Sequence, residues 1–112
     1  MREHFKANWI FQLFFKLTKA RAITINCVAY YKDDKKDVSL WTRLHETFHA
    51  IEQREQGKEF YIGYAKELFK AWHHRHDEIQ AIEYADRMML LRIKHLEKNN
   101  DEFVDWVYKS QS

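Results

Sequence analysis

The order of apolar and polar positions along the chain predicts a mostly helical fold with one short β-hairpin. Residues 21–32 are rich in β-branched and aromatic side chains, and Asn26-Cys27 interrupts them, so we expect two short strands there. Elsewhere, apolar residues recur with the 3.6-residue period of a helix. The ranges that show this period are 3–18, 38–56, 59–72, 77–99 and 101–109. The fold class that we expect is therefore α+β, mostly helical.

A helix over residues 3–18 would be apolar on more than one face. Its apolar side chains are Phe5, Trp9, Ile10, Phe11, Leu13, Phe14, Phe15 and Leu17. They span an arc of about 240°, whereas an ordinary surface helix has a stripe about 100° wide, so something must cover this helix. The range is too short and too polar to span a bilayer, which takes about 20 apolar residues. We expect a helix packed in the fold; contact with a membrane surface or a partner, or cleavage as a signal peptide, are the alternatives.

The helix expected over residues 38–56 organises the chain. We expect Asp37 to cap its start and Gly57 to end it. The helical period places on one side of it Val38, Trp41, His45, Phe48, His49 and Glu52. Two imidazoles therefore face the interior of the protein.

His45, Glu46 and His49 form the motif HExxH within this helix. Residues four apart on a helix lie about 40° apart and about 6 Å along the axis, so both histidines can hold one metal ion. Glu46 lies about 100° round, beside the metal rather than on it. A zinc hydrolase needs this arrangement, in which two neutral imidazoles bind the metal and the carboxylate takes a proton from water. Glu52 faces inward too, but it lies about 10.5 Å of rise from His45, so we interpret it as a supporting or core hydrogen-bonding carboxylate.

The last long helix offers a third metal ligand. Its expected core stripe consists of Ile82, Ala85, Met89, Ile93 and Leu96. Glu78 lies in line with this stripe, one turn before Ile82. A carboxylate aimed at the core needs a partner, because burying an unpaired charge costs several kcal/mol, and a zinc ion on His45 and His49 is the natural candidate. The alternatives are Glu83, Asp77 and Asp86.

Length, charge and cysteine content narrow the classes of protein. The chain has 112 residues, enough for one domain with one core, and 46% of them are apolar, which excludes a disordered chain. Its 19 basic and 17 acidic residues are interspersed and leave a net charge of +2, which gives no electrostatic case for a nucleic-acid partner. Cys27 is the only cysteine, so no internal disulfide can form, and we expect a cytoplasmic protein.

These residues resemble the minigluzincins, small gluzincin metallopeptidases related to the catalytic domains of integral-membrane metallopeptidases. The resemblance covers residues 21–87 and rests on the hairpin at 22–25, the helix at 44–56 and the segment at 78–81. It implies a minimal zincin-like domain in which a small sheet packs on the active-site helix. Thermolysin-like members have an aspartate where this chain has Ile82, so that supporting contact is not expected here.

The resemblance implies a zinc-dependent peptidase. One zinc ion per chain would be held by His45, His49 and Glu78, and Glu46 would be the general base that takes a proton from water and passes it to the leaving amine. A peptide substrate would lie beside an edge strand, for which we expect residues 28–32. Tyr61, Tyr64 and the histidines at 73–76 are candidates for an oxyanion donor. The competing hypothesis is a non-catalytic helical binding or regulatory module, with a structural zinc or none.

The C-terminal segment, residues 99–112, needs a docking surface, because an isolated helix of two or three turns is marginal in water. We expect it to cover the catalytic groove, within its own chain or by exchange in a swapped homodimer. Asp101, Glu102 or Asp105 would then approach the zinc and hold the enzyme latent as a zymogen, as the resemblance also implies. The alternative is a helix that finishes the core. The single domain of residues 1–112 would thus comprise an N-terminal helix (1–20), a catalytic core (21–98) and this segment (99–112).

Overall fold

The computed structural model describes residues 1–68 and 75–110, and the side chains of residues 1–55 and 79–110. It confirms the α+β class, with helix predominating over one small sheet. In chain order the elements are β1 (Arg2–His4), α1 (Trp9–Thr18), β2 (Ala22–Ile25), β3 (Val28–Tyr31), the 3-10 turn η1 (Lys35–Asp37), α2 (Leu40–Leu68), α3 (Arg75–Arg92), the 3-10 turn η2 (Ile93–His95) and α4 (Asn100–Ser110).

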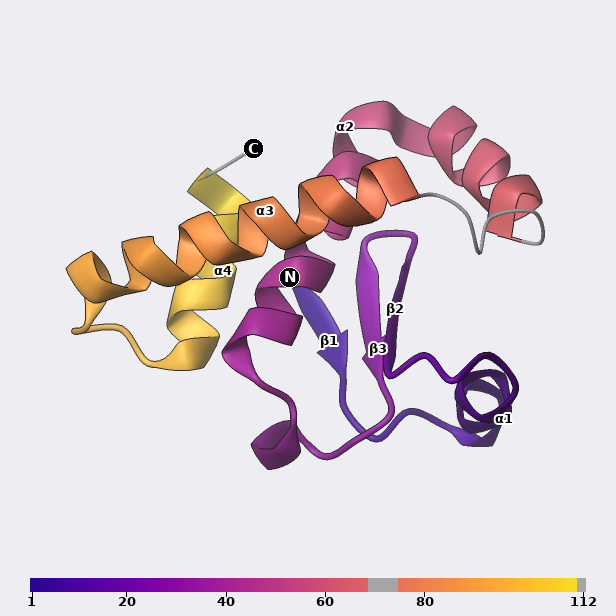
Figure 1. The fold of residues 1–112 in the computed structure, drawn as a ribbon, viewed down its shortest axis with the longest axis horizontal. Coiled ribbons are helices and arrows are strands. Elements are labelled where there is room, and N and C mark those ends of the chain that lie inside the picture. Colours follow the sequence, from indigo (N-terminus) through magenta and orange to yellow (C-terminus); the bar gives the residue numbers. More distant parts are fainter. Residues whose placement is uncertain (69–74, 111–112) are drawn as a thin grey trace.

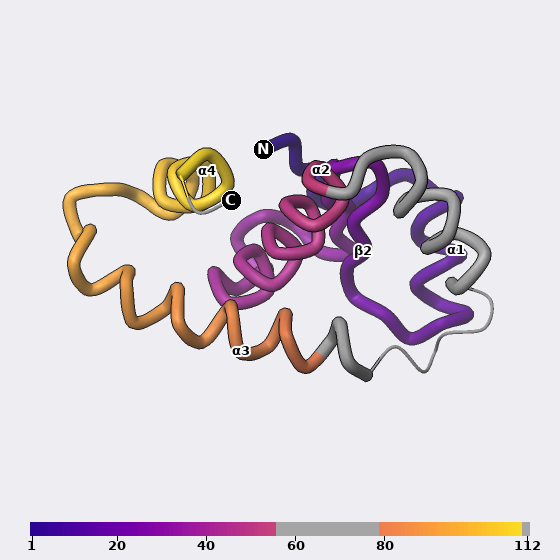
Figure 2. Tube along the Cα trace, turned by 90° about the horizontal axis from the view of Figure 1, so that it is seen from above, coloured from indigo at the N-terminus to yellow at the C-terminus, as the bar shows by residue number. Residues whose placement is uncertain are grey.

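The first half of α2 lies at the centre of the molecule. Figure 1 shows the sheet between α1 and this part of α2, with α3 running across α2. In Figure 2, α4, the first half of α2, the sheet and α1 follow one another along the long axis. Helix α2 contacts β2 and β3 on one side and α3 and α4 on the other. Side chains on this part of α2 therefore lie close to residues from distant parts of the sequence.

The expected hairpin is confirmed as β2 and β3. The two strands are antiparallel and pair Ile25 with Val28, so only Asn26 and Cys27 connect them. Both connecting residues have positive φ, 52° and 64°. Two-residue hairpin turns require this backbone, which asparagine adopts readily and cysteine does not, so the turn costs about 1 kcal/mol or more at Cys27.

The first residues of the chain form a strand, so the expectation of a helix from residue 3 is wrong. Strand β1 pairs in parallel with β3, in the register Arg2 to Val28. The helix starts later, at Trp9, where the Asn8 side chain accepts a hydrogen bond from the Phe11 amide at 3.3 Å. Local periodicity does not report pairing with a strand more than twenty residues away. The apolar pattern of the first residues, taken alone, therefore predicted a helix.

Because β1 joins the sheet, the expectation that residues 28–32 form an edge strand is also wrong. The strand order is β1-β3-β2, which puts β3 in the middle with a hydrogen-bonded neighbour on each side. The edges of this sheet are β1 and β2. Strand β2 is the edge that contacts α2 most extensively.

Helix α2 has different ends from those that the sequence predicts. Ser39, rather than Asp37, caps its start, because the Thr42 amide donates to Ser39 Oγ at 3.1 Å, and Asp37 lies in η1. The helix continues past Gly57 to Leu68, so no separate helix begins at Glu59; residues 69–72 of the expected second helix lie outside the described residues. A single glycine inside a helix costs only about 1 kcal/mol, and with no proline nearby it does not stop the helix.

The buried face of α3 is not the expected one. Ile82 is 42% exposed and Met89 is 37% exposed, and Ile93 and Leu96, both beyond the end of α3 at Arg92, are 66% and 72% exposed. Ala85 of the expected stripe does face the core, and the other core residues of α3 are Ala81, Tyr84 and Met88. Large apolar side chains define a stripe on the sequence, whereas close packing against α2 selects a face that carries two alanines.

Helix α4 packs into the main core, and in the part of the chain that the structure describes none of its acidic residues belongs to the metal-capable group of His45, Glu46 and His49. Phe103, Val104 and Val107 are fully or almost fully buried and pack with Leu44 and Ile51 of α2. The acidic residues of α4 have other partners: Asp101 pairs with Arg43 at 2.7 Å, Asp105 with Lys109 at 2.8 Å, and Glu102 accepts from the Asn99 amide at 3.2 Å. The core requires the apolar face of α4, and this orientation directs its carboxylates elsewhere.

A second, smaller cluster holds α1 on the sheet. Phe15 is buried there with Ala7 and Ile23, and Phe11 stacks on Tyr30 at 4.0 Å between ring centroids. Among the helices that the structure describes, none combines the length and apolar content that crossing a membrane requires.

Candidate metal centre

Three neighbouring side chains on the first half of α2 can meet at one point. One ligand atom each from His45, Glu46 and His49 lies within 4.8 Å of the others, and all three residues are buried. The two imidazole rings are 5.0 Å apart and inclined at 71°. The side-by-side placement predicted from their four-residue spacing is therefore confirmed, and with it the position of Glu46 beside them.

The sheet holds the Glu46 carboxylate in place. Thr24 of β2, only 2% exposed, donates its hydroxyl toward Glu46 Oε1 at 3.0 Å and lies 3.2 Å from the Glu46 carbonyl oxygen. Sequence reasoning missed Thr24, because the contact joins residues 22 positions apart on different elements. The only local signal is a polar residue between two isoleucines in a buried strand.

A glutamine on α2 fixes the hairpin beside the site. Gln53 Nε2 donates to the Thr24 carbonyl at 2.7 Å, and Gln53 Oε1 accepts from the Cys27 amide at 2.8 Å. Gln53 follows Glu46 by seven residues and so lies on the same face of α2. That spacing could have singled out Gln53, and the two residues together bind α2 to β2 through side chains rather than through apolar contact alone.

Glu52 lies beside one of the proposed ligands, as predicted. Its Oε1 atom is 3.4 Å from His49 Nδ1. This oxygen is buried and accepts no hydrogen bond from the residues that the structure describes. Glu52 Oε1 therefore lies beside His49 without a hydrogen bond to it.

An aromatic side chain links His45 to α3. The Trp41 ring lies 5.2 Å from the His45 ring, and Trp41 Nε1 donates to Asp86 Oδ1 at 2.8 Å. Asp86, one of the alternative third ligands, is thus occupied with Trp41, and Glu83 is exposed. Within the described side chains, neither joins the group of three metal-capable residues.

The remaining predicted site residues have side chains outside the described part of the structure. They are Tyr61, Tyr64, the histidines at 73–76, Asp77 and Glu78. The backbone places Asp77 and Glu78 in the first turn of α3. Helix α3 as a whole contacts α2.

A buried tyrosine stands between two carboxylates near the site. Tyr31 is fully buried and donates its hydroxyl to Glu3 Oε2 at 2.8 Å. Burial, and then the negative charges of Glu3 and Glu46, raise the pKa of Tyr31 far above its ordinary value. Tyr31 therefore stays a neutral hydrogen-bond donor and adds no charge beside Glu46.

The donor set suits zinc. Imidazole nitrogens and carboxylate oxygens are the ligands of catalytic zinc sites, which use three protein side chains and keep one position open.

When the chain was compared with protein-family models, curated proteins and solved structures, none of them matched it. The resemblance to minigluzincins thus rests on the residues quoted for it, His45, Glu46 and His49 above all.

Proposed function

We propose that this protein is a zinc-dependent metalloendopeptidase in which Glu46 is the general base. The observation that carries the proposal is the buried group of His45, Glu46 and His49, with the Glu46 carboxylate held by Thr24 beside the two imidazoles. Two histidines alone would support metal binding. A fixed carboxylate next to them supports a reaction that needs a proton acceptor at that place.

In this proposal Glu78 is the third ligand. Ala81 and Ala85 are fully buried on α3, and Glu78 precedes them by three and seven residues, which is the spacing of one helix face. Asp77 precedes Ala81 and Tyr84 by four and seven residues and is the nearest competitor for the same role.

The residues of the site divide the chemistry among them. When bound, zinc would supply a Lewis acid that polarises the scissile carbonyl and lowers the pKa of water. Glu46 would accept the proton of the attacking water and deliver it to the leaving nitrogen, so that a neutral amine leaves rather than an amine anion. Thr24 would keep the carboxylate at one position throughout. The substrate class is a peptide or protein segment, and with one cysteine in the chain a reducing compartment such as the cytoplasm is part of the proposal.

Metal content tests the ligand assignment. We expect one zinc per chain by mass spectrometry of the purified protein, a strong loss of zinc in His45→Ala and in Glu78→Ala, and full zinc in Asp77→Ala. Full zinc in Glu78→Ala together with loss in Asp77→Ala would move the third ligand to Asp77. A parent protein that binds no zinc would overturn the proposal.

Hydrolysis of an unstructured protein substrate tests the base. We expect Glu46→Gln to keep the zinc and to lose about 10² to 10⁴ in rate, because the substitution removes only the proton acceptor. The matched control is Glu55→Gln, an exposed glutamate on the same helix, which should leave the rate unchanged. If Glu46→Gln cleaves as fast as the parent, another group is the base. A zinc-loaded parent without hydrolysis would favour the non-catalytic module.

A further inference from the structure

Helix α1 has two apolar faces, and the described part of the fold covers only one. Its inner face packs on the sheet through Phe11 and Phe15. Its outer face is a stripe of four apolar side chains that stay half to three-quarters exposed: Trp9 74%, Ile10 57%, Leu13 50% and Leu17 75%. At about 100° per residue these four positions cover an arc of about 100°, the width of a helix face that is normally buried.

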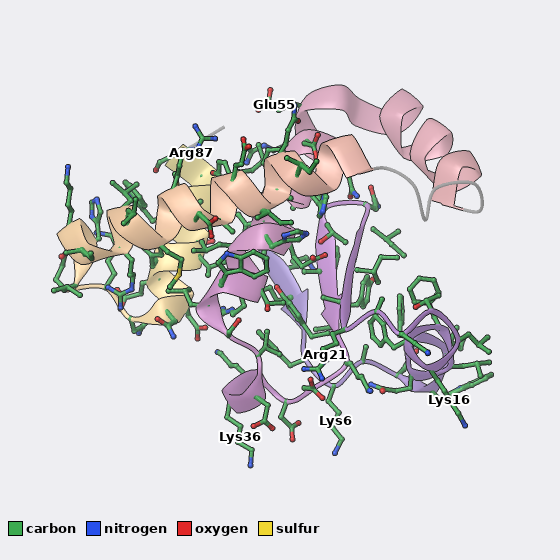
Figure 3. All side chains as sticks on the ribbon, in the orientation of Figure 1. Lys6, Lys16, Arg21, Lys36, Glu55 and Arg87 are labelled. Atoms are coloured by element: carbon green, nitrogen blue, oxygen red, sulfur yellow. The ribbon has the colours of Figure 1, made fainter. Side chains whose placement is uncertain are left out.

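The segment that forms the outer stripe and its flanks carries only positive charge. Residues 5–22 contain no aspartate or glutamate and carry Lys6, Lys16, Lys19 and Arg21, all of them exposed. Figure 3 shows Lys16 extending from α1 and Lys6 extending from the body of the protein below the sheet.

A basic hollow adjoins the end of the stripe. It has a volume of about 530 Å³ and is lined by Lys16, Lys19, Arg21 and Lys32 together with Gln12 and Phe15. Gln12 is held in place, because its Nε2 donates to the carbonyl oxygens of Ala7 and Lys32, each at 3.0 Å. A concave surface lined by four cationic side chains suits a phosphate group.

We propose that α1 docks this protein on an anionic lipid bilayer surface. The outer stripe, with Trp9 at its start, would enter the boundary between headgroups and acyl chains, and the basic side chains would contact lipid phosphates. Amphipathic helices that lie in the membrane interface combine these two features, an apolar face with tryptophan and flanking lysines. Because the sheet already holds α1 folded, binding to the membrane would not carry the entropic cost of forming the helix.

The charge beside the exposed stripe of α1 favours a membrane over a second protein as its partner. The exposed apolar side chains of α3, Ile82 and Leu90 among them, lie on a helix that also carries exposed Glu83 and Asp86, so the charge there is mixed. Within the part of the chain that the structure describes, the α1 segment combines an exposed apolar stripe with basic residues and no acidic ones. The proposal does not depend on the proposed peptidase, since vesicle binding can be measured without any hydrolysis.

Sedimentation with lipid vesicles tests the proposal on the full chain. We expect binding to phosphatidylcholine vesicles that contain about 30% phosphatidylserine and at least tenfold weaker binding to pure phosphatidylcholine, because each basic residue near an anionic surface contributes roughly a fivefold gain. Binding should weaken between about 0.1 M and about 1 M salt, as the Debye length falls from ~10 to ~3 Å. No sedimentation with the anionic vesicles at low salt would overturn the proposal.

Matched pairs of variants separate α1 from the rest of the surface. We expect Leu13→Ser and Lys16→Glu each to weaken vesicle binding by roughly tenfold. Leu90→Ser and Lys94→Glu are controls with the same chemistry at exposed positions near the other end of the molecule, and they should bind as the parent does. All four positions are at least half exposed or polar, so circular dichroism should show unchanged folding. Equal loss in the control pair would overturn the proposal.

The same variants also distinguish the other occupants of this face. If the parent dimerises in sedimentation velocity and Leu13→Ser abolishes the dimer without any vesicle binding by the parent, the stripe is a contact between two chains. If the parent is a monomer that ignores vesicles, the stripe does not dock on lipid. Either result would refute docking on lipid.

Discussion

Thr24 decides where the Glu46 carboxylate lies, although the two residues belong to different elements. A glutamate beside two histidines on a helix has three rotatable side-chain bonds and could turn away from them. The hydroxyl of Thr24 at 3.0 Å from Oε1 removes that freedom, and Gln53 in turn holds the Thr24 carbonyl at 2.7 Å. The proton acceptor of the proposed reaction is thus positioned by a buried polar network in which each member has a partner.

Removing the Thr24 hydroxyl should therefore reduce catalysis more than stability. We expect Thr24→Val, which keeps the shape of the side chain, to lower the hydrolysis rate about tenfold with zinc retained, because a freed carboxylate is no longer held at one place. Thr47→Val is the matched control: Thr47 is also fully buried, and its hydroxyl donates to the Arg43 carbonyl at 2.7 Å, away from Glu46. Equal rates for the two variants would show that Thr24 is not a positioning residue.

Among the elements, α4 completes the core that holds the helices together. It buries three side chains against α2, and its first turn is stabilised locally, since Asn99 Oδ1 accepts from the Glu102 amide at 2.8 Å and Glu102 accepts from the Asn99 amide. This is the reciprocal arrangement of a capping box. A helix of 11 residues that is capped and buried in this way is part of the core.

Truncating a core residue of α4 should destabilise the whole fold. We expect Phe103→Ala to lower the free energy of unfolding by about 3 to 5 kcal/mol, because Phe103 is fully buried and the substitution leaves a cavity. Lys109→Ala, at an exposed position of the same helix, should change it by less than about 0.5 kcal/mol. Urea denaturation measures both. If α4 were only a cover over the site, Phe103→Ala would leave stability unchanged and raise activity.

At the scale of the whole molecule, Arg43 ties together parts of the chain that are far apart in sequence. Its guanidinium, on α2, contacts Glu3 of β1 at 2.7 and 3.0 Å and Asp101 of α4 at 2.7 Å. Lys35 of η1 also pairs with Asp101. The side chain of Arg43 is 4% exposed, so its charge needs these partners to be buried without a large cost.

This network should make stability depend on pH through Asp101. Hydrogen bonds from Lys35, and then from Arg43, lower the pKa of Asp101 below its ordinary 3.8. A lowered pKa contributes stability that is fully present above pH 3.8 and is lost as the pH falls through the lowered value. We expect Asp101→Asn to be less stable than the parent at neutral pH, by at most about 1 kcal/mol because Asp101 is half exposed, and to match it in strong acid. Asp37→Asn is the control, and a pH-independent difference in thermal unfolding would contradict the assignment.

The sequence by itself determined the local features of this protein. The spacing of His45 and His49 puts both on one face of any helix, and the run of β-branched residues broken at Asn26-Cys27 makes a hairpin wherever it packs. The apolar residues of α4 required that it dock on something. Each of these follows from the period of a helix or a strand, which depends only on neighbours in the chain.

Contacts across the chain decided the rest. The pairing of β1 with β3 made an expected edge strand central, Thr24 came to hold Glu46, and α3 buried its alanine-bearing face instead of its largest side chains. These outcomes depend on which surfaces fit closely when elements far apart in sequence meet, and periodicity carries no information on that fit. Local spacing thus determines which side chains can act together, while tertiary packing determines which neighbours hold them in place.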